Sequence, residues 1–272
     1  MSRNVLAGRN VELLRECCGA GSLLAFDFDG TLAPLGPDAH GTRMRTETAE
    51  LLRALAHAAP VAVITGRSVA DATGRLEGIP MLAVIGNHGA EPSRFAARAA
   101  REVAGWLPLL EAALATCPGA VIENKGQSVS VHYWHAESPP AVLQAVEAVV
   151  PALPHRVTVV HGTCLVNLVP RGAPDKGDAL ARLITANGLP GAVFAGDELT
   201  DEPAFRCAQS SPAGMGVRVG RLKSSAAAFH VDTQLDVDAL LTEMLVGCSR
   251  QARSRNAGLA AATSASGSLA AD

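Results

Sequence analysis

Asp27 and Asp29 are carboxylates that could take part in catalysis, and they lie at the point where an apolar run ends and a turn is predicted to begin. In an extended segment, a spacing of two residues places both side chains on one side of the chain. Gly30 follows them and lets the backbone turn closely around a ligand. One carboxylate can act as a nucleophile while the other gives and takes a proton. Hydrolysis of a phosphate ester needs such a pair, together with strong electrostatic stabilisation.

Other polar residues follow or precede the predicted strands. Thr65 ends the second apolar run, Asp197 and Asp201 follow a later one, and Lys176 begins the helical segment between them. In an open α/β sheet, ligands bind beyond the carboxyl ends of the strands. We expect Thr65 to donate a hydrogen bond to a phosphoryl oxygen, and Lys176 to neutralise charge there.

These carboxylates would repel one another and an anionic substrate. A hard divalent cation with oxygen ligands resolves that repulsion, and Mg²⁺ suits a site of few carboxylates plus a phosphate. Asp197 is the best candidate for the third ligand.

Each residue also has an ordinary explanation when taken alone. A D-x-D pair is common in acidic loops, Lys176 could be a solvated residue at a helix start, and Asp197 could cap the next helix. Their joint occurrence at four element ends, in this order, favours a common site.

Short apolar runs separated by helical patterns predict the elements that position these residues. We expect a doubly wound, mostly parallel, Rossmann-like α/β sheet. Its predicted strands are Ser22 to Phe28, Val61 to Thr65, Met81 to Ile85 and Ala192 to Ala195. Its predicted helices are Thr46 to Ala59 and Asp175 to Asn187, the second capped by Asp175 and ended by Gly188.

The middle of the chain has a different pattern, with helix, strand and strand occurring twice. The strands alternate between apolar and polar residues and are joined by short turns, which predicts an antiparallel sheet. We therefore expect an α+β domain, residues 94–170, inserted into the α/β domain as a lid. Its predicted helices are Arg101 to Thr116 and Pro140 to Val150; its predicted strands are Ala120 to Glu123, Gln127 to Trp134, Arg156 to His161 and Cys164 to Val169, the last two joined by Gly162 and Thr163.

The composition is that of a globular protein, with 48% hydrophobic and 18% charged residues. A net charge of −3 and the lack of a basic run before the tail disfavour nucleic-acid binding. No apolar run is long enough to cross a membrane, and the N-terminus lacks the layout of a signal peptide. Six scattered cysteines without a C-x-x-C pair suit a reducing cytoplasm. The tail, residues 249–272, is predicted to be disordered; nucleic-acid contact by its three arginines is disfavoured.

Four segments resemble the haloacid dehalogenase superfamily of phosphohydrolases and, within it, the trehalose-6-phosphate phosphatases. They are Leu24 to Pro34 around the Asp27-Phe28-Asp29 pair, Ile64-Thr65-Gly66-Arg67, Lys176-Gly177, and Gly196 to Phe205. The similarity extends over residues 20 to 245. It implies a core domain of residues 1–93 and 171–248 with a C2-type cap.

The resemblance also implies roles for individual residues. Asp27 would be the nucleophile and Asp29 the general acid and then base. Thr65 and Lys176 would hold the phosphoryl group. Mg²⁺ would be bound by Asp27, the backbone carbonyl of Asp29 and Asp197, with Asp201 near its waters.

Further segments imply a sugar site. Residues 123–128 resemble the family's cap stretch that grips sugar hydroxyls, so Glu123, Lys125 and Ser128 are expected to bind substrate, with His88 and Arg67 from the core. Glutamate accepts and lysine donates hydrogen bonds, as sugar hydroxyls require. Alternatively, Glu123 and Lys125 form an exposed ion pair at the tip of a hairpin, and His88 is a hydrogen-bonded residue of a turn.

Two residues depart from the family pattern. Glu198 stands where an aspartate is frequent, and we place it outside the metal's ligands. Trp134 stands where an arginine is frequent, so any contact made by that arginine is lost or replaced.

The leading hypothesis is a Mg²⁺-dependent phosphatase that acts on trehalose 6-phosphate, a small-molecule substrate. The alternative is a phosphatase that acts on glucosylglycerol, mannosylglycerate or sucrose phosphate. The core motifs do not exclude it, because only the cap would contact the sugar. A non-catalytic binding domain is disfavoured by the presence of Asp27, Asp29 and Asp197. A nucleotide-driven kinase is disfavoured because the chain lacks a P-loop motif.

Overall fold

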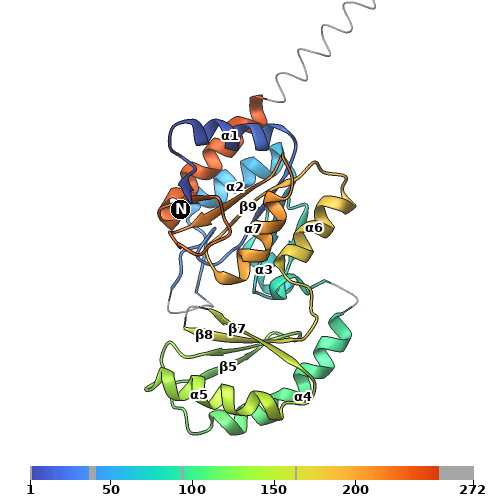
Figure 1. The fold of residues 1–272 in the computed structure, drawn as a ribbon, viewed down its shortest axis with the longest axis vertical. Coiled ribbons are helices and arrows are strands. Elements are labelled where there is room, and N and C mark those ends of the chain that lie inside the picture. The colour runs from blue at the N-terminus through green and yellow to red at the C-terminus, as the bar shows by residue number, and fades with distance from the viewer. Residues whose placement is uncertain (1, 37–40, 93–94, 163, 251–272) are drawn as a thin grey trace, which may run out of the picture.

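The strands form two separate sheets in the computed structural model, which describes residues 2–36, 41–92, 95–162 and 164–250 (Figure 1). The larger sheet has seven parallel strands in the order β1-β11-β10-β9-β2-β3-β4. The smaller has four antiparallel strands in the order β5-β6-β8-β7. These sheets confirm the predicted α/β class with an additional α+β unit.

An interior strand of the large sheet leads into the pair Asp27 and Asp29. The strand β2 (Leu23–Phe26) lies between β9 (Ala192–Gly196) and β3 (Val61–Ile64), and all its residues are buried. Burial on both faces is typical of a parallel strand. The remaining strands of this sheet are β1 (Arg3–Asn4), β4 (Ala83–Ile85), β10 (Met215–Val219) and β11 (Phe229–Val231).

Helices cover both faces of this sheet. On one face, Leu14 of α1 (Arg9–Gly19), Leu52 of α2 (Thr46–Ala58) and Leu240 of the helix at 237–250 share a core cluster. On the other, Leu180 of α6 (Lys176–Ala186) and Phe205 of α7 (Glu202–Gln209) belong to a second cluster. The helix α3 (Val69–Arg75) follows β3.

The small sheet has a core of its own. Trp106 of α4 (Ala96–Leu114) and Val142 of α5 (Pro139–Val149) pack with Val166 of β8. Both helices lie on the side of this sheet that faces away from the large sheet, so its other side faces the α/β unit (Figure 1). We call this small unit the cap; its strands are β5 (Val121–Asn124), β6 (Val129–His132), β7 (Val157–Gly162) and β8 (Leu165–Pro170).

The predicted helices and strands are present, with shifted ends. The largest shift is in α4, which begins at Ala96 instead of Arg101. Ser249 and Arg250, assigned to the tail, continue the helix at 237–250, so that boundary was wrong; the rest of the predicted tail and Thr163 lie outside the described residues. In the described part of the chain, no helix combines the length and apolar character needed to cross a membrane.

Candidate active site

The turn after β2 places Asp27 in the interior of the α/β unit. Its backbone N–H donates to the carbonyl of Ala195 on the neighbouring strand at 2.9 Å, and only 4% of the residue is exposed. Gly30 has a φ of 75°, and a β-carbon there would lie 2.2 Å from Oδ2 of Asp197. Glycine is therefore required both by the left-handed backbone and by the close approach of this carboxylate.

Lys176 forms the central ion pairs of the site. Its Nζ lies 2.9 Å from Oδ1 of Asp27 and donates to Oδ1 of Asp201 at 2.6 Å. Asp175 caps the helix α6 in a capping box with Asp178, which fixes where Lys176 begins the helix. Burial alone would lower the pKa of Lys176, but Asp201 and Asp27 outweigh it and raise the pKa, so the ammonium stays charged.

Three carboxylates gather beside Lys176. Asp27, Asp197 and Asp201 each offer an oxygen, and these atoms lie within 4.8 Å of one another. Burial, opposed by Lys176 and assisted by neighbouring carboxylates, raises the pKa of Asp27 to about 8. Burial and the charges of Asp27 and Asp201 raise the pKa of Asp197 well above its usual value. Oxygen donors with excess negative charge fit a hard divalent cation such as Mg²⁺.

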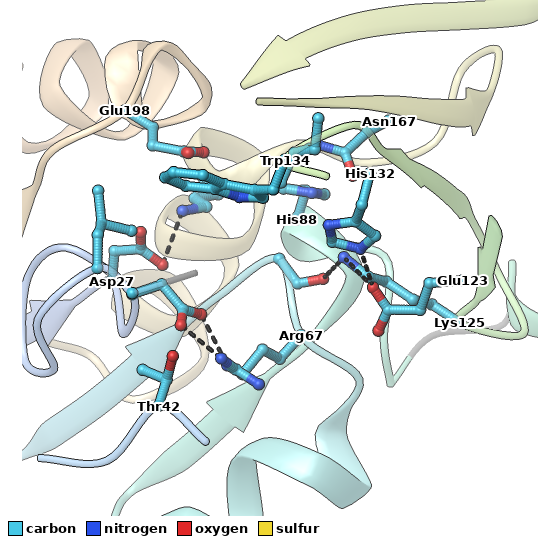
Figure 2. A pocket seen from close by; sticks show the side chains of 16 residues that line it. Asp27, Thr42, Arg67, His88, Glu123, Lys125, His132, Trp134, Asn167 and Glu198 are labelled. Carbon is cyan, nitrogen blue, oxygen red and sulfur yellow. Dashed lines mark hydrogen bonds and ion pairs between the residues drawn. The ribbon is translucent and has the colours of Figure 1, made fainter. Parts of the chain in front are cut away.

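The side chain of Asp29 lies apart from this cluster and pairs with Arg67. The guanidinium contacts both carboxylate oxygens, Nη2 to Oδ1 at 2.5 Å and Nε to Oδ2 at 2.7 Å (Figure 2). A third bond joins Nη1 of Arg67 to Oδ2 of Asp71 at 2.7 Å. The bidentate pair fixes the orientation of Asp29. The expected role of Asp29 as a metal ligand concerns its backbone carbonyl and stays a prediction.

Glu123 and Lys125 reach the site from the cap. Nζ of Lys125 donates to the carbonyl of Gly66 at 3.2 Å and lies 3.8 Å from Oε2 of Glu123, which is 2.7 Å from Nε2 of His132 (Figure 2). The expected pair therefore occurs, and it meets the core at the loop after β3. Burial lowers the pKa of Lys125 below that of an ordinary lysine.

The turn after β4 contributes His88 to the same pocket. The residue has a left-handed φ of 56°, and its ring packs against Gly66, where a β-carbon would lie 2.4 Å from Cε1. Burial, followed by the positive charges of Lys176 and Lys125, holds the pKa of His88 well below its usual range. A neutral imidazole can both donate and accept hydrogen bonds, as binding of a hydroxyl requires.

Four predicted site residues lie outside the pocket lining: Asp197 and Asp201 of the carboxylate cluster, and Ser128 and Thr65. Ser128 is fully buried, and its hydroxyl donates to Oδ1 of Asn87 at 2.7 Å, so it joins cap to core instead of facing the cavity. Thr65 is 1% exposed, and its hydroxyl accepts from the backbone N–H of Arg67 at 3.2 Å.

A pocket between the α/β unit and the cap brings the other groups together. It is lined by the predicted Asp27, Asp29, Arg67, His88, Glu123, Lys125 and Lys176, and also by Leu35, Gly36, Thr42, Gly66, His132, Trp134, Leu165, Asn167 and Glu198. Both residues that depart from the family pattern, Trp134 and Glu198, are among them. Sequence reasoning missed Asn167, although a polar residue within the apolar run 165–169 is a signal of a buried polar role.

A family model described as trehalose-phosphatase matches residues 25–238. An uncharacterized glycosyl hydrolase of Mycobacterium tuberculosis is 34% identical over 253 residues, 86% of this chain and 19% of that protein. A trehalose-phosphate phosphatase of Mycobacterium avium is 34% identical over 202 residues, 69% of this chain and 51% of that protein. This chain thus spans about a fifth of the length of the Mycobacterium tuberculosis protein and about half of the length of the Mycobacterium avium protein.

The fold has relatives among solved structures. The C-terminal domain of a trehalose-6-phosphate phosphatase from C. albicans superposes with a TM-score of 0.75 at 20% identity, covering 90% of this chain and 98% of that one. At that identity the likeness supports the fold. The match of the family model over most of the chain decides the family, and the chain belongs to the trehalose-phosphatase family.

Proposed function

We propose that this chain hydrolyses trehalose 6-phosphate to trehalose and phosphate, with Mg²⁺ and through a phosphorylated Asp27. One observation carries the proposal: Asp27, ion-paired with Lys176, lies in a pocket whose opposite wall is the Glu123, Lys125 and His132 group of the cap. A nucleophile and a set of sugar-type hydrogen-bonding groups therefore face one cavity.

The first step is transfer of the phosphoryl group to the protein. A carboxylate oxygen of Asp27 forms a bond to phosphorus while the bond from phosphorus to the sugar oxygen breaks. The departing sugar oxygen receives a proton from the carboxyl group of Asp29. Lys176 keeps its positive charge beside Asp27 and stabilises negative charge on the phosphoryl oxygens.

The second step regenerates the protein. Water forms a new bond to phosphorus, the bond to the Asp27 oxygen breaks, and Asp29 takes the proton from water. Arg67 pairs with both oxygens of Asp29 in this structure and is proposed to position that group; one of the two bonds has to open when Asp29 carries the proton. Thr65 is proposed to donate a hydrogen bond to the phosphoryl group.

Asp27, Asp197 and Asp201, with the backbone carbonyl of Asp29, are the groups proposed to hold Mg²⁺. When bound, the ion would offset the clustered negative charge and polarise a phosphoryl oxygen.

The cap is proposed to select the sugar. Glu123, Lys125, His132 and Asn167 line the pocket with groups that can donate or accept hydrogen bonds. The family match and the name of the Mycobacterium avium relative support trehalose 6-phosphate among the sugar phosphates. We also propose that residues 94–170 form the cap domain and that residues 1–93 and 171–248 form the core domain. The six free cysteines support a further proposal, that the protein works in a reducing cytoplasm.

Phosphate release from a panel of sugar phosphates tests the proposal. The panel contains trehalose 6-phosphate, sucrose 6-phosphate, glucosylglycerol phosphate and glucose 6-phosphate, each with Mg²⁺ and with a chelator. The proposal predicts preferred release from trehalose 6-phosphate that the chelator abolishes. Equal rates on every sugar phosphate would contradict the substrate assignment, and chelator-resistant turnover would contradict the metal requirement.

A further inference from the structure

The indole of Trp134 is exposed inside the pocket. The residue is 41% exposed and lines the same cavity as Asp27 and Lys176 (Figure 2). The other tryptophan, Trp106, is fully buried in the core of the cap. Apart from the imidazoles of His88 and His132, Trp134 is the aromatic side chain among the described lining residues. The chain therefore places its one accessible indole at the candidate site.

The backbone around Trp134 is held on both sides. The residue follows β6, and the N–H of the preceding Tyr133 donates to the carbonyl of Cys164 at 3.0 Å. After it, the N–H of Glu137 donates to the carbonyl of Pro118 at 3.2 Å. Among the aromatic and cation contacts of the described residues, none involves the Trp134 ring. A fixed backbone and an unstacked ring suit a binding surface.

Polar groups surround this ring in the pocket. Glu198 reaches the cavity from the core, and Glu123 and Asn167 reach it from the cap. Leu165 adds apolar surface. Pockets for small molecules combine apolar and aromatic walls with a few placed polar groups. A pyranose ring matches that combination, because its C–H face is apolar and its rim carries hydroxyls that donate and accept hydrogen bonds.

We propose that the indole of Trp134 stacks on a pyranose ring of the substrate and makes this residue a determinant of specificity for sugar phosphates over acyclic phosphate esters. The inference rests on the proposed phosphatase function and adds to it a contact that the family resemblance does not supply, since an arginine is frequent at this position. Asp27 and Lys176 contact the phosphoryl group, whereas Trp134 contacts the sugar.

Kinetics on two substrates test the inference. Trp134→Ala is expected to lower kcat/KM for trehalose 6-phosphate about tenfold or more, as loss of an aromatic stacking contact does, and to change kcat/KM for glycerol 2-phosphate less than about threefold. Trp134→Phe should restore most of the loss, because it keeps an aromatic face. Leu109→Ala is the matched control, since Leu109 is an exposed apolar residue of the cap outside the pocket lining. An equal loss on both substrates, or no loss on trehalose 6-phosphate, would overturn the inference.

Fluorescence gives a second readout without turnover. Trehalose is expected to shift the tryptophan emission and to protect it from acrylamide quenching in the unaltered protein and in Trp106→Phe, but not in Trp134→Phe. Persistence of the shift in Trp134→Phe would contradict the inference. If phosphate release fails on every sugar phosphate, the proposed function fails, while titrations with trehalose and with sucrose still decide whether Trp134 binds a sugar.

Discussion

Asp27 illustrates how residue chemistry depends on surroundings. Burial is the main reason why the pKa of Asp27 is raised to about 8; Lys176 opposes this rise, and neighbouring carboxylates add to it. The same environment makes the group a suitable nucleophile once its charge is balanced by cations. The strand-end positions of Asp27 and Asp197 made these residues predictable from the sequence, and Lys176 was predictable from its place at a helix start. The pairing of Asp29 with Arg67 was not predictable, because it depends on how two separate loops meet.

Lys125 should give substrate binding an alkaline limit. Its pKa is lowered by burial, so its ammonium loses its proton at a lower pH than that of an ordinary lysine does. We expect KM for trehalose 6-phosphate to rise as pH increases through this lowered pKa. Lys125→Met should raise KM about tenfold at neutral pH, because a charge-assisted hydrogen bond is removed, and should abolish the alkaline rise.

Steady-state kinetics from neutral to alkaline pH measure this effect, with Lys223→Met, at an exposed lysine, as the control. An unchanged alkaline rise of KM in Lys125→Met would show that another group is responsible.

At the scale of elements, the turn after β2 must close on Asp197. Gly30→Ala would place a β-carbon 2.2 Å from Oδ2 of Asp197, whereas at Gly172, which has a similar φ of 80°, nothing lies within 4 Å. Both substitutions share the cost of a left-handed alanine, about 1 to 2 kcal/mol. We expect Gly30→Ala to reduce phosphate release at least about a hundredfold and Gly172→Ala to leave it nearly unchanged. Similar activities of the two variants would contradict the role assigned to the turn.

The hairpin of β5 and β6 is joined to the turn after β4 at Asn87, which accepts from the buried Ser128 hydroxyl and donates through Nδ2 to the carbonyl of Lys125 at 3.4 Å. Ser128→Ala would remove the donor to Asn87 and leave a buried acceptor with one partner fewer, which costs about 1 to 3 kcal/mol. We expect urea unfolding to show this loss while KM changes little, because Ser128 does not line the pocket. Ser210→Ala, at an exposed serine, is the control. A large rise in KM with unchanged stability would restore the earlier prediction that Ser128 binds substrate.

Much of the fold was predictable at this scale because β2, β3 and β9 are apolar runs with polar ends. The edge strand β1 and its neighbour β11 escaped prediction because they are two and three residues long. The start of α4 was misplaced because Ala96 and its neighbours lack the apolar spacing that marks the later turns. The sequence does not show which side of the cap faces the core, because this depends on packing between segments that are distant in sequence. For this reason Thr42, Leu165 and Asn167 could not be predicted to line the pocket.

For the whole molecule, a net charge of −3 contrasts with the cations at the pocket, where Arg67, Lys125 and Lys176 converge. Four carboxylates line the same pocket, so the local field would attract a phosphate ester only once a divalent cation is bound beside these groups. The acidic cluster below them should make stability depend on pH and Mg²⁺.

The raised pKa values of Asp27 and Asp197 mean that the folded protein binds protons that the unfolded chain releases between about pH 4 and 8. The metal-free protein should therefore lose stability as pH rises through this window, and Mg²⁺ should offset the loss at its upper end. Urea unfolding at several pH values, with chelator and with Mg²⁺, measures both effects. Asp197→Asn should weaken both; an unaltered Mg²⁺ response in that variant would contradict the assigned cluster.

Transfer of the phosphoryl group to Asp27 is the step on which the proposed mechanism depends. Its most direct test is acid quenching during turnover of trehalose 6-phosphate with Mg²⁺, followed by mass spectrometry of the peptide that contains Asp27. We expect a phosphorylated aspartate at position 27, and no turnover above background in Asp27→Asn while Asp232→Asn, at an exposed aspartate, remains active. Phosphate release that continues in Asp27→Asn, or a phosphoryl group found on another residue, would contradict it.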